Sequence, residues 1–161
     1  MLTRRMALSS GLAAIAGASL LQFAGARAAE EGHIVLTDAE WRSKLTADQY
    51  AVLRKEGTEP PYTSPLLHEE RKGVFACAAC GLDLFSSSTK FDSGTGWPSF
   101  WAPLDKAVKT HVDKSYGMIR SAVTCRRCDG HLGHVFDDGP KPTGLRYCMN
   151  GLALTFKPAT A

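Results

Sequence analysis

Two C-x-x-C pairs constrain the fold of this chain more than any other feature of its sequence. They lie in "FACAACG" and "VTCRRCDG", as Cys77 with Cys80 and Cys125 with Cys128. A two-residue spacer lets both sulfurs of a pair face one point, and we expect Gly81 and Gly130 to relieve the two turns. Four thiolates in two such turns are typical of a tetrahedral structural zinc site.

Two alternatives to a metal site depend on the same four cysteines. A disulfide within C-x-x-C would close a small strained ring, and two such rings in one domain would be unusual. A redox-active C-x-x-C is typical of a βαβ context, which neither pair has. Iron stays open as the metal, because four sulfurs suit iron as well as zinc. The pairs are 44 residues apart, so a metal would join distant strands, and we expect it to be structural, with no open coordination position.

The first 28 residues have the pattern of an export signal. "MLTRRMALSSGLAAIAGASLLQFAGARA" has no acidic residue, begins with Arg4 and Arg5, continues as an apolar run and ends in A-R-A. "TRRMAL" resembles a twin-arginine signal. A retained membrane anchor is the alternative, although the run is only marginally long enough to cross a bilayer. We expect a signal over 1–28, a flexible lead-in over 29–36, one domain over 37–158, and a periplasmic protein.

The charge of the remaining chain argues against two classes of partner. The sequence has 19 basic and 16 acidic residues, and three arginines (Arg4, Arg5 and Arg27) but no acidic residue lie in 1–28. The rest of the chain therefore carries 16 charges of each sign and has a formal net charge of zero. Such a balance indicates neither a nucleic acid nor, once the signal is removed, a membrane as partner.

The hydrophobic pattern predicts two short helices followed by a β domain. Thr37 with Glu40 and Thr46 with Gln49 form capping boxes, and Gly57 marks a helix end. We therefore expect two helices between residues 37 and 56. From residue 73 onward, short runs separated by Gly, Pro, Asp and Ser predict about eight strands in mostly antiparallel sheets.

Cys148 has no partner among the five cysteines. It lies in "GLRYCMN", with Arg146 and Asn150 two residues away on the same side of a predicted strand. A lone cysteine is either buried and inert or reactive, and Arg146 would favour the thiolate. "GHLGHVFDDG" adds His131 and His134, which can be metal ligands, core residues or proton donors beside a thiol. The remaining histidines, His33, His68 and His111, are isolated in the sequence and are expected at the surface.

The tryptophan of "DSGTGWPSFW" has two interpretations of equal weight. Trp97 precedes Pro98, which favours an extended conformation. Its ring can pack in the core, or it can form the wall of a pocket for a small apolar group.

Three of these segments, together with both cysteine pairs, closely resemble the B-type methionine sulfoxide reductases. They are "KFDSGTGWPSF", "HLGHVFDDGP" and "TGLRYCMN", and the resemblance covers about residues 40–156. The resemblance implies a mainly β fold, a β-tent of two antiparallel sheets with short N-terminal helices and one structural zinc ion. It also implies reduction of the R epimer of methionine sulfoxide in proteins or peptides, which repairs oxidative damage.

The resemblance also assigns roles to single residues. Cys148 corresponds to the nucleophile that becomes a sulfenic acid. The other implied catalytic residues are His131, His134, Asn150 and Arg146; the implied substrate-binding residues are Trp97 and Phe136; and the implied zinc ligands are Cys77, Cys80, Cys125 and Cys128.

The chain departs from the family pattern at Thr95, where many members have a second, resolving cysteine. We therefore expect an external thiol, from a thioredoxin-like protein or a small molecule, to clear the sulfenic acid of Cys148. Two other functions stay open. One is a zinc-ribbon-like binding module without catalysis, and the other is a thiol peptidase that uses Cys148 and His134.

Overall fold

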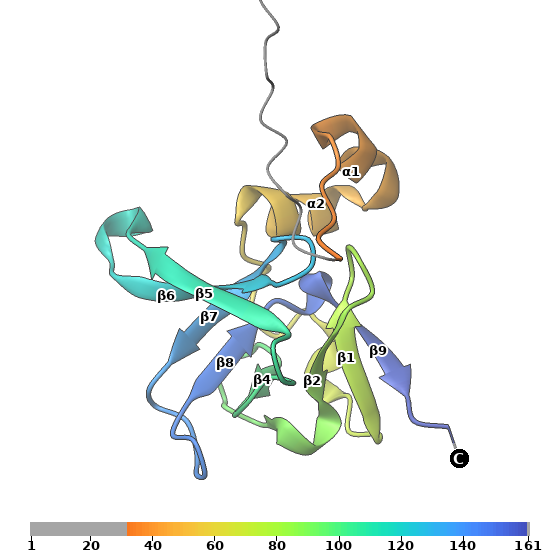
Figure 1. Cartoon of the computed structure of the whole chain (residues 1–161). Helices are drawn as coiled ribbons and strands as arrows, with labels where there is room; N and C mark the ends of the chain where they lie inside the picture. The colour runs from red at the N-terminus through yellow and green to blue at the C-terminus, as the bar shows by residue number, and fades with distance from the viewer. Residues whose placement is uncertain (1–31, 161) are drawn as a thin grey trace, which may run out of the picture.

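The computed structural model describes residues 32–160 (Figure 1). The predicted signal over 1–28 and the start of the predicted lead-in lie outside the described residues. Within 32–160, no helix is both long and apolar enough to cross a membrane.

Two short helices precede the sheets, as predicted. Helix α1 spans Asp38–Lys44 and α2 spans Ala47–Lys55, and both predicted capping boxes are present. Helix α2 ends just before Gly57, as predicted, although the left-handed residue at this end is Glu56, with φ 56°. Gly57 is instead required by space, since a Cβ at this position would lie 2.9 Å from the carbonyl oxygen of Ala51.

Within residues 32–160, nine strands form two antiparallel sheets, which confirms the predicted mainly β architecture (Figure 1). The three-stranded sheet has the order β2-β1-β9, made of Asp83–Ser86, Gly73–Cys77 and Leu154–Pro158. The six-stranded sheet has the order β3-β4-β8-β7-β6-β5, made of Lys90–Phe91, Ser99–Phe100, Arg146–Met149, His131–Phe136, Arg120–Cys125 and Val108–Asp113. The same part of the chain contains four short 3-10 helices: η1 Pro65–His68, η2 Ser87–Thr89, η3 Ser115–Gly117 and η4 Gly151–Ala153.

The strand that sequence analysis missed is β4, which has only two residues. Ser99 and Phe100 lie inside "GWPSF", directly after Pro98, where no period-2 pattern can develop. This strand is nevertheless central to the site, because it pairs with β8 and places Ser99 opposite Cys148.

An aromatic cluster fills the space between the two sheets. Phe100 of β4 stacks on Phe85 of β2, with ring centroids 4.4 Å apart, and meets Phe75 of β1 edge-on at 4.9 Å. All three side chains are fully buried. Such ring pairs contribute about 0.5–1.5 kcal/mol each beyond the area that they bury, so this cluster joins the sheets firmly.

A β-bulge in β7 decides where its two histidines point. In the β6–β7 ladder, Thr124 pairs with His131 while Val123 pairs with Gly133, so Leu132 is an extra residue on β7. In a regular strand, residues three apart face opposite sides. Because of the bulge, the side chains of His131 and His134 point to the same side of the sheet. The centroids of their rings lie 5.3 Å apart in a T-shaped arrangement.

Candidate active site and metal site

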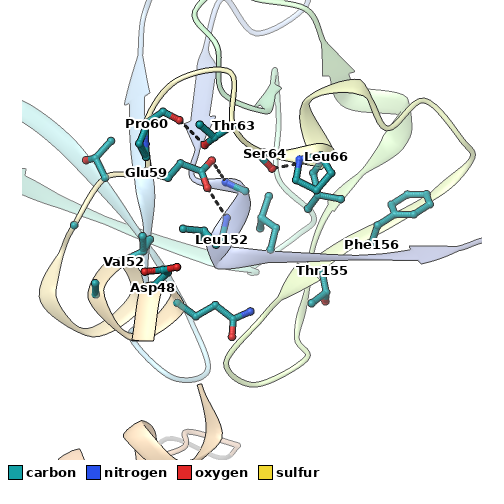
Figure 2. Close-up of a pocket in the computed structure, with 17 residues that line it drawn as sticks. Asp48, Val52, Glu59, Pro60, Thr63, Ser64, Leu66, Leu152, Thr155 and Phe156 are labelled. Carbon is teal, nitrogen blue, oxygen red and sulfur yellow. Dashed lines mark hydrogen bonds between the residues drawn. The ribbon is translucent and has the colours of Figure 1, made fainter. Parts of the chain in front are cut away.

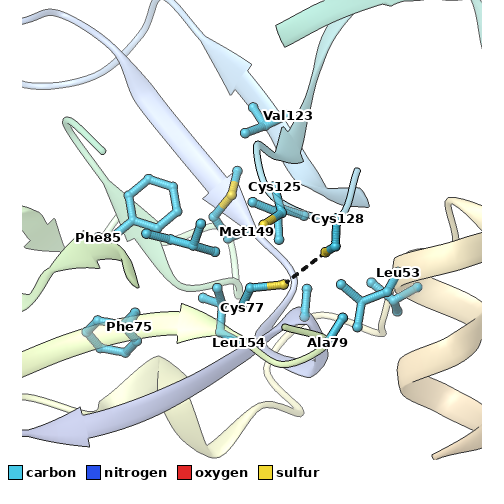
Figure 3. Close-up of a cluster of buried hydrophobic side chains, with 14 of the residues drawn as sticks. Leu53, Phe75, Cys77, Ala79, Phe85, Val123, Cys125, Cys128, Met149 and Leu154 are labelled. Atoms are coloured by element: carbon cyan, nitrogen blue, oxygen red, sulfur yellow. Dashed lines mark hydrogen bonds between the residues drawn. The ribbon is translucent and has the colours of Figure 1, made fainter. Parts of the chain in front are cut away.

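The four paired cysteines meet at one point between the two sheets (Figure 3). Cys77 ends β1 of the three-stranded sheet and Cys125 ends β6 of the six-stranded sheet. The Sγ atoms of Cys77 and Cys128 are 3.7 Å apart, those of Cys80 and Cys125 are 3.5 Å apart, and all four lie within 4.8 Å of one another.

These distances fit a metal site and do not fit disulfides. A tetrahedron of sulfurs about 2.3 Å from a zinc ion has S···S edges of about 3.8 Å, whereas a disulfide bond is about 2.05 Å long. The sulfurs also influence one another, because hydrogen bonding led by Cys125, together with burial, raises the pKa of Cys77 and Cys128, although the bond with Cys77 acts in the opposite direction on Cys128. Four thiolates at this point need a cation, and the four residues can hold a metal ion.

The two cysteine turns are built differently from each other. Gly81 follows the first pair with φ 73°, as predicted. In the second turn the left-handed residue is Asp129, with φ 54°, so the prediction for Gly130 is wrong. Gly130 is small for another reason, because a Cβ there would lie 3.0 Å from a methyl carbon of Leu53 in α2. The second turn is therefore packed tightly against the helical part of the domain.

Cys148 lies in a row of residues that crosses the six-stranded sheet on one face. It pairs with Ser99 on one side and with His134 on the other, and the row continues through Ala122 to His111. Neighbouring strands are about 4.8 Å apart, so directly paired residues are in side-chain contact range. The topology thus brings Cys148 and His134, which the sequence predicted together, into one cross-strand pair.

Hydroxyl groups of the loop before β4 and of β4 itself lie near the Cys148 sulfur. Cys148 is partly buried, and Oγ1 of Thr95 lies 3.8 Å from its Sγ. Ser93 holds Thr95 and Ser99 in place through hydroxyl contacts of 2.8 and 2.7 Å. Burial raises the pKa of the Cys148 thiol, while Thr95, the charge of Arg146 and Ser99 act in the opposite direction. The residues around the sulfur thus partly offset the effect of burial.

Arg146 is fixed beside this cysteine by two partners. Its guanidinium forms a bidentate pair with Asp138, with both N–O distances 2.8 Å, and lies 4.4 Å above the ring of Phe136. This planar, two-pronged contact holds the charge in one orientation. Arg146 and Phe136, both predicted site residues, therefore lie against each other on adjacent strands.

His131 is a buried base with free hydrogen-bonding capacity. Its side chain is 3% exposed, and neither ring nitrogen has a partner among the described residues. Burial, together with the neighbouring His134, lowers the pKa of His131 to about 4. The ring is therefore neutral at pH 7 and keeps one N–H donor for a polar group that enters the site.

His134 is oriented by an acidic residue that the sequence did not single out. Its Nε2 lies 2.8 Å from Oδ2 of Asp113, and Asp113 also accepts hydrogen bonds from Ser115 N at 2.8 Å and from Arg120 at 2.7 Å. These bonds, led by that of the Ser115 main chain, lower the pKa of Asp113. Asp113 ends β5, 21 residues before His134, and only the strand order reveals the contact.

Trp97 and Asn150 are tied to each other through Glu59. The indole Nε1 of Trp97 donates to the carbonyl oxygen of Glu59 at 3.0 Å, and the N–H of Glu59 donates to Oδ1 of Asn150 at 3.0 Å. The amide nitrogen of Asn150 donates to the carbonyl of Leu132 at 3.1 Å. Both polar ends of the buried Asn150 side chain thus bond main-chain groups, and a direct role for it in catalysis stays a prediction.

A cleft of about 750 Å³ lies between α2, the 57–66 loop and β9 (Figure 2). Its lining contains no cysteine and no histidine. Two of the lining residues, Glu59 and Gly151, are joined by a hydrogen bond. Gly151 belongs to the segment that follows Cys148, so the cleft lies next to that segment.

Known proteins share most of this chain. The SelR domain model matches residues 45–158. A protein of Agrobacterium fabrum is 53% identical over 123 residues, which cover 76% of this chain and 91% of the relative. Relatives from Pseudomonas putida (58% over 120 residues, 74% of this chain and 90% of the relative) and Methanosarcina mazei (52% over 127 residues, 78% and 91%) are similar to the same extent. All three relatives are named peptide methionine sulfoxide reductase MsrB.

Proposed function

The chain belongs to the SelR/MsrB family of peptide methionine sulfoxide reductases, and we propose that it reduces methionine (R)-S-oxide in proteins or peptides through Cys148. The observation that carries the proposal is the cross-strand pair of Cys148 and His134, with Thr95 Oγ1 3.8 Å from the sulfur. A lone, partly buried thiol beside two histidines suits a nucleophile better than a binding module.

The reaction needs a thiolate and one proton. The Cys148 thiolate attacks the sulfoxide sulfur while the sulfoxide oxygen takes up a proton. Methionine leaves, and the hydroxyl group remains on Cys148 as a sulfenic acid. In this proposal His134, whose Nε2 lies 2.8 Å from Asp113, supplies the proton directly or through water. The neutral His131 can donate its N–H to the sulfoxide oxygen before transfer.

Arg146 favours the attacking form of the nucleophile. Its charge acts against the effect of burial on the Cys148 pKa, and the pair with Asp138 keeps that charge in position. In this proposal Asn150 helps to position or bind the sulfoxide oxygen, because its amide nitrogen bonds the carbonyl of Leu132 in β7, the strand that carries both histidines.

Trp97 and Phe136 determine which sulfoxide fits. In this proposal the indole ring of Trp97 contacts the methyl group on sulfur, and the ring of Phe136 lies 6.5 Å from that of His134 and helps to bind the substrate. A methyl group on one side and the oxygen near the histidines on the other define one epimer of the sulfoxide.

An external thiol completes the cycle. Of five cysteines in the chain, four are in the sulfur cluster, and residue 95 is threonine. A thiol from a thioredoxin-like protein or a small molecule attacks the Cys148 sulfenic acid, releases water and forms a mixed disulfide, which a second thiol reduces. The products are methionine, water and one disulfide of the reductant.

Zinc is the metal that best suits the four sulfurs, and its role in this proposal is structural. A closed tetrahedral S₄ site has no position for substrate, and it would join β1 of one sheet to β6 of the other. The four cysteines therefore contribute to folding, while Cys148 contributes the chemistry.

Export completes the proposal. The pattern over residues 1–28 is that of a twin-arginine signal, and that route carries proteins that are already folded. Zinc could thus be loaded before transport, and the enzyme would then repair oxidised methionine in the periplasm.

A stereospecific assay tests the function. The protein is given the separate R and S epimers of a blocked methionine sulfoxide, with either a dithiol or a thioredoxin as reductant. We expect turnover of the R epimer alone. Absence of turnover with either reductant would favour a zinc-ribbon-like binding module, and cleavage of a peptide that alkylation of Cys148 blocks would favour a thiol peptidase.

A further inference from the structure

Glu59 is a buried acid whose hydrogen bonds reach several segments of the proposed site. It lies in "TEPPYTSPL", which begins as a loop and ends in η1, and it is only 4% exposed. Its carboxylate accepts hydrogen bonds from the main-chain N–H groups of Gly151 at 2.5 Å and Leu152 at 2.8 Å (Figure 2). These groups begin η4, directly after the strand that carries Cys148.

The main chain of Glu59 makes the second half of the connection. Its carbonyl oxygen accepts the indole N–H of Trp97 at 3.0 Å, and its N–H donates to Oδ1 of Asn150 at 3.0 Å. One residue therefore bonds Trp97 on one side and the end of β8 on the other. Within residues 32–160 the Trp97 ring makes no other hydrogen bond.

Close packing leaves this loop little freedom. A Cβ at Gly151 would overlap the side chain of Ser64, and a Cβ at Gly96 would lie 2.7 Å from Cβ of Pro61. The N–H of Tyr62 also donates to the carbonyl oxygen of Gly96 at 2.7 Å. The segment that begins with Glu59 thus contacts both residues 96–97 and residues 150–152, so a shift of Glu59 is transmitted to Trp97.

We propose that Glu59 is a positioning residue that fixes the Trp97 ring relative to Cys148 and so sets the size of the group accepted on the sulfoxide sulfur. The inference rests on the proposed function, in which Trp97 contacts the methyl group of the substrate. The carboxylate is suited to this task because it accepts from two main-chain donors at once. A glutamine side chain has the same shape but only one accepting oxygen. Its N–H₂ group would face one of the two buried main-chain N–H groups, which would then lose its acceptor.

The test compares Glu59→Gln with Glu70→Gln, which changes an exposed acid later in the same connection between α2 and β1. Both proteins are assayed with R sulfoxides that carry a methyl or an ethyl group on sulfur. For the parent and for Glu70→Gln we expect a preference for methyl of about 10-fold or more in kcat/KM. For Glu59→Gln we expect KM for the methyl substrate to rise about 10-fold and the preference to fall to roughly 3-fold, with kcat changed less than KM.

A readout without substrate accompanies the kinetics. The ¹H–¹⁵N signal of the Trp97 indole, assigned with Trp97→Phe, is expected to shift in Glu59→Gln and to keep its position in Glu70→Gln. The rate at which iodoacetamide alkylates Cys148 is expected to stay within about 2-fold, because the thiol itself is not moved in this proposal. Should Glu59→Gln fail to fold, Glu59→Asp is used, which retains the charge but shortens its reach.

The outcomes separate this inference from the proposed function. A parent protein that reduces no sulfoxide would overturn the function, whereas an active parent with an unchanged methyl preference in the folded Glu59 variant would overturn the role of Glu59 alone. An equal loss with methyl and ethyl substrates, carried by kcat and without a shift of the indole signal, would also reject it.

Discussion

Oγ1 of Thr95 lies 3.8 Å from Sγ of Cys148, at the position where many related enzymes carry a second cysteine. The hydroxyl can bond the sulfur but cannot form a disulfide with it. Ser93 contacts the hydroxyls of both Thr95 and Ser99, so the three form a small group on one side of Cys148. The loop before β4 therefore offers Cys148 a hydroxyl group and no second thiol.

A single turnover without reductant should leave a sulfenic acid on Cys148. We expect one methionine per protein, a dimedone adduct on Cys148 and no loss of two hydrogens in the intact mass, because no internal thiol is free to react. A disulfide between Cys148 and one of the metal-site cysteines, with release of metal, would contradict this.

The variant Thr95→Cys supplies the matched comparison for that experiment. Its new sulfur would replace an oxygen that already lies 3.8 Å from Sγ of Cys148, so a small adjustment allows a disulfide. We expect this variant to lose two hydrogens after one turnover and to give no dimedone adduct. Thr95→Ser is the control and should behave like the parent protein.

Replacement of His134 by alanine should slow the reduction by about 10²-fold or more, because in the proposed mechanism this residue transfers a proton beside Cys148. Steady-state rates with the R sulfoxide measure the effect. His68→Ala, which changes an exposed histidine of η1, should leave the rate within about 2-fold, since surface substitutions rarely matter.

Cys148→Ser sets the lower limit for the same assay. It should abolish turnover while the fold and the metal content stay those of the parent. A loss in His134→Ala of only a few-fold would assign that histidine to structure, and residual turnover near the parent level in Cys148→Ser would place the nucleophile elsewhere.

The parts of this molecule that follow from local sequence could be predicted, and those that follow from topology could not. The capping boxes at Thr37 and Thr46 and the spacing of the cysteine pairs are local patterns, and each is found in the structure. The bulge at Leu132, which turns two histidines to one side, has no sequence signature.

The missed site contacts have the same origin. Asp113 reaches His134 only because β5, β6 and β7 are neighbours in the sheet. Glu59 lies 38 residues before Trp97 and 91 residues before Asn150, so no window of sequence contains the contacts. The left-handed residues Glu56 and Asp129 also stand where glycine would be the default expectation.

The predicted export signal can be tested in cells. Replacing Arg4 and Arg5 together by lysine should stop export, because the twin-arginine route depends on that pair. The mass of the protein from the periplasm should correspond to a chain that begins near Ala29. Unchanged export of the double variant would indicate another route, and a mass that retains the first 28 residues would indicate a membrane anchor.

His131 should make the folded protein less stable in mild acid. Its pKa is 6.5 in the unfolded chain and about 4 in the folded protein, since burial disfavours the charged ring. Between these values the unfolded chain binds a proton that the folded chain does not. The free energy of unfolding should therefore fall as the pH drops from about 6.5 to 4, by up to about 3 kcal/mol from this residue.

Urea unfolding of the parent and of His131→Gln measures this contribution. The difference between the two proteins should change with pH over that window, while effects of acid on the metal site are common to both. A ring-proton NMR titration of His131 gives the value directly. A midpoint near 6.5 would show that the ring is not held neutral by burial.

Removal of the metal should unfold the domain, although Cys148 is not one of the four clustered cysteines. The four cysteines join the end of β1 to the end of β6, and Gly130 packs the second turn against Leu53 of α2. Because the binding of a structural zinc ion is coupled to folding, Cys77→Ser should lose one equivalent of zinc and the cooperative thermal transition. Metal analysis and thermal unfolding by circular dichroism measure both effects, with Cys148→Ser as the control that keeps them. A metal-free Cys77→Ser protein with the thermal stability of the parent would show that the sulfur cluster does not hold the two sheets together.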